Sequence, residues 1–227
     1  MTTRDATTSA IQAPLEPQFA SIEQQSFANT FGMWVFLASE LLFFGPLLLG
    51  YFYVRVHYPQ GSAAASRHTD FLLGTADTAV LLTSSFLMAL AGHAAQAQQR
   101  RRAARLLLAV AALGIVFLAI KGWEYRGEFH EQLFPGAGFR PRQGGEAQDL
   151  PGMQIFFVLY FLLTGLHALH LTAGLLACLV LAFGLRRPAP AGPSAEAVEL
   201  AGLYWHFVDL VWIFLYPLLY LVGRAGS

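Results

Sequence analysis

The sequence places His206 and Asp209 inside an otherwise apolar stretch, YWHFVDLVWIFLYPLLYLV, at residues 204–222. The two residues are three positions apart, nearly one helical turn, so their side chains share one face of the predicted helix. A carboxylate at bilayer depth costs roughly 2.5 kcal/mol or more, so this face should meet protein or water rather than acyl chains. The pair is therefore a candidate ligand set, proton relay or polar contact between helices. Its expected counterparts are polar groups on neighbouring helices, with Glu40 or the His167 and His170 pair as candidates.

A second acid, Glu40, lies about nine residues into the apolar segment that starts at Phe31. This position is near the bilayer midplane, where an unpaired carboxyl group would keep its proton because its ionised form is poorly solvated. Two interpretations have equal weight here. Glu40 is either a proton-handling or ligand-contacting acid, or a protonated carboxyl group bonded to a neighbouring helix.

Two histidines, His167 and His170, are three positions apart in the segment LLTGLHALHLTAGLL. This spacing invites a haem or metal interpretation. Two axial haem ligands must approach opposite faces of the ring, however, so this pair cannot supply both. His93 and His206 could complete a set, although His93 lies beside an arginine cluster and suits a solvated position. We instead predict hydrogen bonds from His167 and His170 to other helices, which the small residues around them would bring close.

Two further acids lie close to predicted membrane boundaries. Asp77 is within one or two turns of such a boundary and is expected to reach the headgroup region. Glu124 follows Lys121 and Trp123 in the segment AIKGWEYRGEF, with Arg126 nearby. We therefore expect Glu124 to form an ion pair at the surface, with a role at a partner interface left open.

The elements that must position these residues are membrane-spanning helices. Of the 227 residues, 56% are hydrophobic and 12% are charged, far from the composition of a soluble domain. Five segments meet the length of about 20 apolar residues that a transmembrane helix needs: residues 31–56, 72–94, 106–123, 153–185 and 203–222. We predict an all-α fold: a polytopic membrane protein with a bundle of five transmembrane helices in residues 31–227, preceded by a polar segment in residues 1–30.

Other features shape the helices and their links. Trp205 and Trp212 are seven positions apart, so one stripe of the last helix should pack against other helices, and Pro217 should interrupt that helix. The Pro and Gly residues after position 58 predict a loop between the first two spans. Residues 127–151 read as an external loop, and residues 188–193, PAPAGP, should end the fourth helix firmly.

The charge distribution sets the expected orientation. Basic and acidic residues are equal in number, 14 each, so the total charge predicts no attraction to nucleic acid. Dense arginines occupy two short links, at positions 100, 101, 102 and 105 and at positions 186 and 187. Short basic loops stay in the cytoplasm, which places the N-terminus there and the C-terminus outside.

Cys178 is the only cysteine, so the sequence excludes a disulfide framework. We expect its side chain to be a buried apolar group.

Four motifs occur in order between Phe31 and the C-terminus: SELLFF, KGWEY, GLHALH and YWHFVDLVWIFLYPLLY. Together they resemble subunit III of the haem-copper oxidases. The resemblance implies a helical bundle docked on catalytic subunit I, with subunit II, in a proton-pumping terminal oxidase of the bacterial plasma membrane that serves aerobic electron transport. It also implies an accessory chain with no catalytic, cofactor or metal residues of its own, because haem and copper belong to partner subunits.

The resemblance assigns positions as well. In the family this subunit stabilises the catalytic subunit, binds phospholipids and supports proton uptake, and the acid of the SE motif is carbodiimide-reactive in some members. The matching residues, which become candidates for proton or lipid association, are Glu40, Glu124, His167, His170, His206 and Asp209.

The chain also departs from the larger family members. Those have seven spans, whereas five are predicted here, and the two missing helices wall a lipid-filled cleft in the larger form. The electron donor stays open between cytochrome c and quinol, with nitric oxide reductases as close relatives. Cytochrome c oxidase is the first interpretation on the breadth of the family. Two other classes stay as alternatives: an autonomous haem b cytochrome, and a proton-coupled transporter that uses Glu40, Asp77 and Asp209, although no internal repeat supports the transporter.

Overall fold

The computed structural model describes residues 15–136, 138–140, 150–187 and 192–221. These residues form six α-helices and a final π-helical turn, and none of them lies in a β-strand. Five helices are long and apolar enough to cross a membrane, which confirms the predicted fold class. The elements are α1 (Ile22–His57), α2 (Pro59–His68), α3 (Phe71–Gln96), α4 (Arg100–His130), α5 (Leu150–Gly184), α6 (Ala195–Tyr216) and η1 (Pro217–Leu221).

The helices extend beyond the predicted apolar segments because side-chain caps, rather than the membrane boundary, set several of their first residues. Ser21 caps α1 by accepting a hydrogen bond from the Gln24 amide, and Ser194 caps α6 by accepting one from the Ala197 amide. At its other end, α4 continues through His130, so the predicted loop at residues 127–151 begins later than expected. Residues 141–149 of that loop lie outside the described part of the chain, as do residues 1–14, 188–191 and 222–227.

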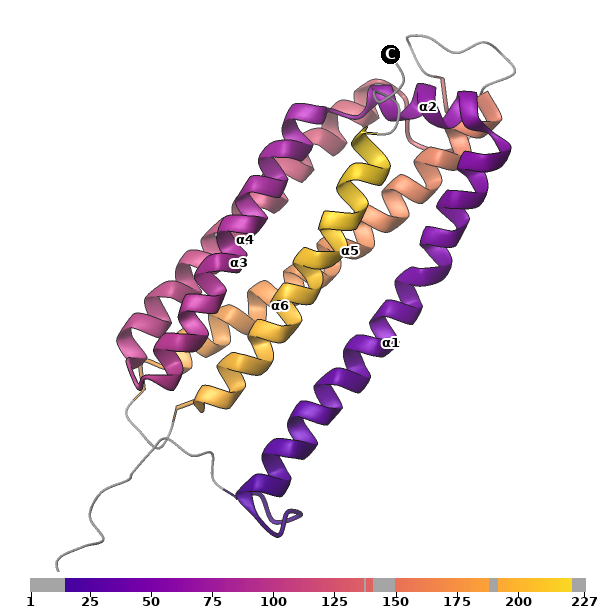
Figure 1. Ribbon diagram of the computed structural model, residues 1–227. Coiled ribbons are helices and arrows are strands. Elements are labelled where there is room, and N and C mark those ends of the chain that lie inside the picture. The colour runs from indigo at the N-terminus through magenta and orange to yellow at the C-terminus, as the bar shows by residue number, and fades with distance from the viewer. Residues whose placement is uncertain (1–14, 137, 141–149, 188–191, 222–227) are drawn as a thin grey trace, which may run out of the picture.

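The predicted loop after the first span is wrong, because residues 59–68 form helix α2. Pro59 occupies the first helical turn, where no amide hydrogen bond is lost, and alanines follow it. Helix α2 contacts α5 and η1 and lies across one end of the bundle (Figure 1). The Ser66 hydroxyl donates to the Leu219 carbonyl at 2.9 Å, which ties α2 to the end of the last span.

Helix α1 stands at the edge of the bundle. In Figure 1 it meets the other helices near α2 and diverges from α6 toward its own N-terminal end. Only 17% of its most apolar window is buried, against 39% for α4, α5 and α6, so α1 is the peripheral span. A groove of about 520 Å³ separates α1 from α6, and its lining includes Trp34, Leu37, Leu41, Leu203, Phe207 and Leu210.

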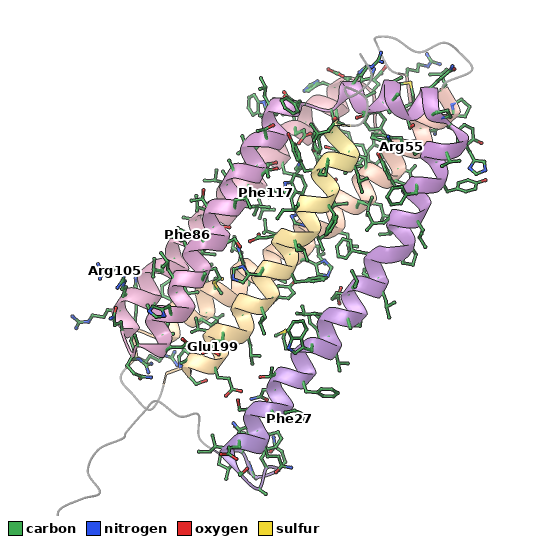
Figure 2. All side chains as sticks on the ribbon, viewed as in Figure 1. Phe27, Arg55, Phe86, Arg105, Phe117 and Glu199 are labelled. Atoms are coloured by element: carbon green, nitrogen blue, oxygen red, sulfur yellow. The ribbon has the colours of Figure 1, made fainter. Side chains whose placement is uncertain are left out.

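The core is built around the two tryptophans of α6, which confirms the predicted packing stripe. Trp205 and Trp212 are 1% and 0% exposed. Their indole groups donate to hydroxyl groups of α3, Trp205 to Ser84 and Trp212 to Thr78, each at 3.1 Å. Phe117 of α4 points into the bundle (Figure 2) and meets the Trp212 ring edge-on, with ring centroids 4.9 Å apart.

Two glycines on neighbouring helices make room for the Trp205 ring. A Cβ atom added to Gly114 of α4 or to Gly174 of α5 would lie 3.1 Å from that ring. The close approach of α4, α5 and α6 therefore depends on these two glycines.

Beyond Trp212, the α-helix is interrupted at Pro217, as predicted, and the chain continues as a π-helical turn.

We expect Gly114→Val to destabilise the bundle by about 1–3 kcal/mol, because the new side chain would overpack the site against Trp205. The measurement is thermal unfolding of the solubilised protein. Gly122→Val is the matched control, since it makes the same change in the same helix at a position with nothing within 4 Å. Equal unfolding temperatures for the two variants would contradict this account of the packing.

Candidate functional site

Glu40 of α1 and His170 of α5 form a pair between helices. The Glu40 Oε2 and His170 Nε2 atoms are 2.9 Å apart, and the side chains are 18% and 11% exposed. His170 Nδ1 lies 2.8 Å from the Leu166 carbonyl, which can only accept, so Nδ1 carries a proton. The Glu40 to His170 contact therefore shares one further proton, as carboxylic acid and imidazole or as carboxylate and imidazolium.

His167 has a different environment from His170. Its ring is fully buried between Phe117 and Trp212, with ring centroids 5.5 and 5.1 Å away. Neither ring nitrogen has a hydrogen-bond partner among the described residues. The predicted contact across helices is confirmed for His170 and wrong for His167. The two side chains are about 60° apart around α5, so His170 contacts Glu40 of α1 while His167 packs against rings of α4 and α6.

The His206 and Asp209 face of α6 meets α3. Ser85 Oγ lies 2.7 Å from His206 Nδ1, whereas neither carboxyl oxygen of Asp209 has a hydrogen-bond partner among the described residues. Asp209 is 3% exposed, while His206 lies at the edge of the groove between α1 and α6. The counterparts predicted for this pair, Glu40 or the two histidines of α5, are wrong. Those residues satisfy one another or pack elsewhere, and a serine of α3 takes their place.

The structure also contains a buried charged group around Lys121. The Lys121 ammonium lies 2.6 Å from Glu124 Oε2, 2.6 Å from the Tyr220 hydroxyl and 3.4 Å from Asp77 Oδ2. It also sits 4.5 Å from the centre of the Trp212 ring, a cation–π distance. Lys121, Glu124 and Asp77 are 2%, 4% and 0% exposed. Four helical elements, α3, α4, α6 and η1, therefore meet at one ammonium group.

This group corrects two sequence-based predictions. Asp77 does not reach the headgroup region, and the ion pair of Glu124 is buried and uses Lys121 rather than a surface cation. Glu128, which the sequence reasoning missed, is also buried near Tyr160 and Glu124, and neither of its carboxyl oxygens has a hydrogen-bond partner among the described residues. One signal could have found it. Positions 121, 124 and 128 fall on one stripe of α4, and the helix continues past the predicted membrane boundary.

The described residues contain no group of three or more His, Cys, Asp or Glu side chains placed to hold a metal ion. Two of the four histidines considered as ligands use ring nitrogens in contacts with the protein, His170 with Glu40 and His206 with Ser85. His93 is exposed near the end of α3, as predicted. Cys178 is buried in α5, also as predicted. These contacts of His170 and His206 connect helices to one another.

Several known proteins are similar to this chain over most of its length. A family profile described as cytochrome c oxidase subunit III matches residues 152–224. Cytochrome c oxidase subunit 3 of Thermostichus vulcanus is 31% identical over 194 residues, which is 85% of this chain and 87% of that protein. Cytochrome bo(3) ubiquinol oxidase subunit 3 of Pseudomonas aeruginosa is 31% identical over 202 residues, 87% of each chain.

A further relative carries the similar region within a longer chain. Heme-copper oxidase subunit I+III of Aeropyrum pernix is 32% identical over 197 residues, which cover 84% of this chain and 22% of that protein. With the two subunit 3 proteins, it extends the similarity well beyond α5 and α6. The chain belongs to the cytochrome c oxidase subunit III family.

Proposed function

We propose that the chain is the accessory subunit III of a bacterial haem-copper terminal oxidase and binds catalytic subunit I in the plasma membrane. The observation that carries this proposal is the relative named subunit I+III, which joins the two subunits in one protein. A covalent link keeps two partners at high effective concentration, as suits subunits that work together. Haem, copper and oxygen reduction then belong to the partner chain, while this chain stabilises it.

The relatives differ in the electron donor that their names imply. Cytochrome c oxidase and quinol oxidase subunits match at similar identity, 31% for the examples above. We propose cytochrome c as the donor of the complex and subunit II as a further partner, with a quinol oxidase as the alternative. The donor would bind elsewhere in the complex in either case.

The groove between α1 and α6 supports a role in lipid binding. Its lining is almost entirely apolar, and α1 exposes large side chains such as Leu42 and Val56. Acyl chains of membrane phospholipids fit such a surface. Glu40, on the same helix α1, shares a proton with His170 of α5, which suits a part in proton uptake. The arginines in the first turns of α4, next to the short link from α3, favour a cytoplasmic N-terminus.

Gentle solubilisation of the native complex tests the assignment. We expect this chain to co-purify with a subunit I that gives a reduced-minus-oxidised haem spectrum, and the chain separated from its partner to be colourless. Mass spectrometry of the co-purifying chains identifies the subunits. Purification without a haem-bearing partner, or a redox-active Soret band in the isolated chain, would overturn the proposal in favour of another membrane protein or an autonomous cytochrome.

We expect Glu40→Gln to leave assembly largely intact, because glutamine still fits between α1 and α5. The variant loses the proton that Glu40 shares with His170 and the hydrogen bond that this proton makes, which is worth about 1–3 kcal/mol. Fewer turnovers before inactivation, or slower proton uptake, are the expected results. Ser39→Ala is the control, since its exposed hydroxyl bonds only within α1. Wild-type values for Glu40→Gln in both assays would remove the functional role of Glu40.

A further inference from the structure

A polar cavity of about 180 Å³ lies at the α2 end of the bundle, where the end of α2, the start of α3 and the last turns of α4 meet. Its lining is rich in titratable side chains: His68, Asp70, Glu124, Glu128 and Glu131. Glu131 is 54% exposed and lies 3.6 Å from His68, so these two residues form the solvent side. Glu124 and Glu128 are 4% exposed and form the inner side.

The inner side of the cavity continues into the charged group around Lys121. Glu124 belongs to both, because its Oε2 atom binds the Lys121 ammonium while the residue also lines the cavity. Its other oxygen, Oε1, is buried and has no hydrogen-bond partner among the described residues. A path of polar groups thus leads from the exposed end of the cavity to Asp77 on α3.

The charges in this group do not balance if every acid is ionised. Asp77, Glu124 and Glu128 face one cation, Lys121, and the other polar neighbours are the hydroxyl groups of Tyr160 and Tyr220. The charged groups that act on Glu128 are Glu124, Lys121 and the rim residue Glu131. Uncompensated buried carboxylates are strongly unfavourable, whereas a protonated carboxyl group is neutral and can donate a hydrogen bond.

We propose that this cluster is a proton-holding site, in which Glu124 is the carboxylate paired with Lys121, Asp77 and Glu128 keep their protons, and the cavity lets Glu128 exchange its proton with water. The distances fix the assignment, because the ammonium is closer to Glu124, at 2.6 Å, than to Asp77, at 3.4 Å. A divalent cation fits less well, since the described acids and histidines form no group of three around one point. The site depends only on residues of this chain and is independent of the oxidase assignment.

Infrared spectra of the intact complex, compared between each variant and the wild type, test the proposal. We expect Glu128→Gln to lose one carbonyl-stretching band of a protonated carboxylic acid that shifts in D₂O, and Asp77→Asn to lose another. Glu131→Gln is the matched control and should keep both bands, because that side chain is solvated. If Glu128→Gln and Asp77→Asn retain every carboxylic acid band of the wild type, these acids are ionised and the proposal fails.

Removing the Lys121 ammonium gives a second test, in which a carboxylic acid band should be gained rather than lost. In Lys121→Met no ammonium remains to stabilise the Glu124 carboxylate, so we expect one additional carboxylic acid band. An unchanged number of bands would contradict the charge balance.

If the variants do not assemble, the wild-type protein provides the test. We expect its thermal stability to fall as the pH rises, because the acids are then forced to ionise, and we expect Ca²⁺ to leave the carboxylic acid bands unchanged. A thermal stability that does not change with pH, or loss of the bands on adding Ca²⁺, overturns the proposal.

Discussion

The lack of water inside a bilayer is the constraint on which the rest of this structure depends, because a polar side chain within a span can find a hydrogen-bond partner only in protein. Several of the partners found here join different helices. Glu40 joins α1 to α5, Ser85 joins α3 to the polar face of α6, and Lys121 joins α4 to α3 and η1. Polarity that is costly in lipid therefore specifies which helices are neighbours.

Close packing around Trp205 holds the helices together alongside the polar contacts. The indole group of Trp205 bonds to Ser84 on one side, and its ring fills the space left by Gly114 and Gly174 on the others. Helix α1 takes little part in this packing and keeps an apolar groove against α6. The helices are thus closely packed against one another except at the peripheral helix α1. This suits a subunit whose remaining apolar surface contacts lipid or another subunit.

The sequence predicts the five spans well because length and hydropathy determine them almost alone, and it predicts the tryptophan stripe from spacing. It does not predict α2, because Pro59 resembles a loop signal until it is placed in the first turn of a helix. It also misplaces the partners of Asp77, Glu124 and Asp209, because a face can be deduced from spacing within one helix whereas its neighbour depends on how helices pack. The family resemblance named Glu40 and His170 as candidates, but their pairing required the structure.

The central claim is that the charged side chains within the spans stabilise one another by pairing inside this chain. A double-mutant cycle on Lys121 and Glu124 tests it most directly, with the unfolding free energy of the complex measured for Lys121→Met, Glu124→Gln and the double variant. Each single change leaves its former partner buried without compensation, so the account predicts that the double variant is less destabilised than the sum of the two, by about 1 kcal/mol or more. Strictly additive effects would contradict it.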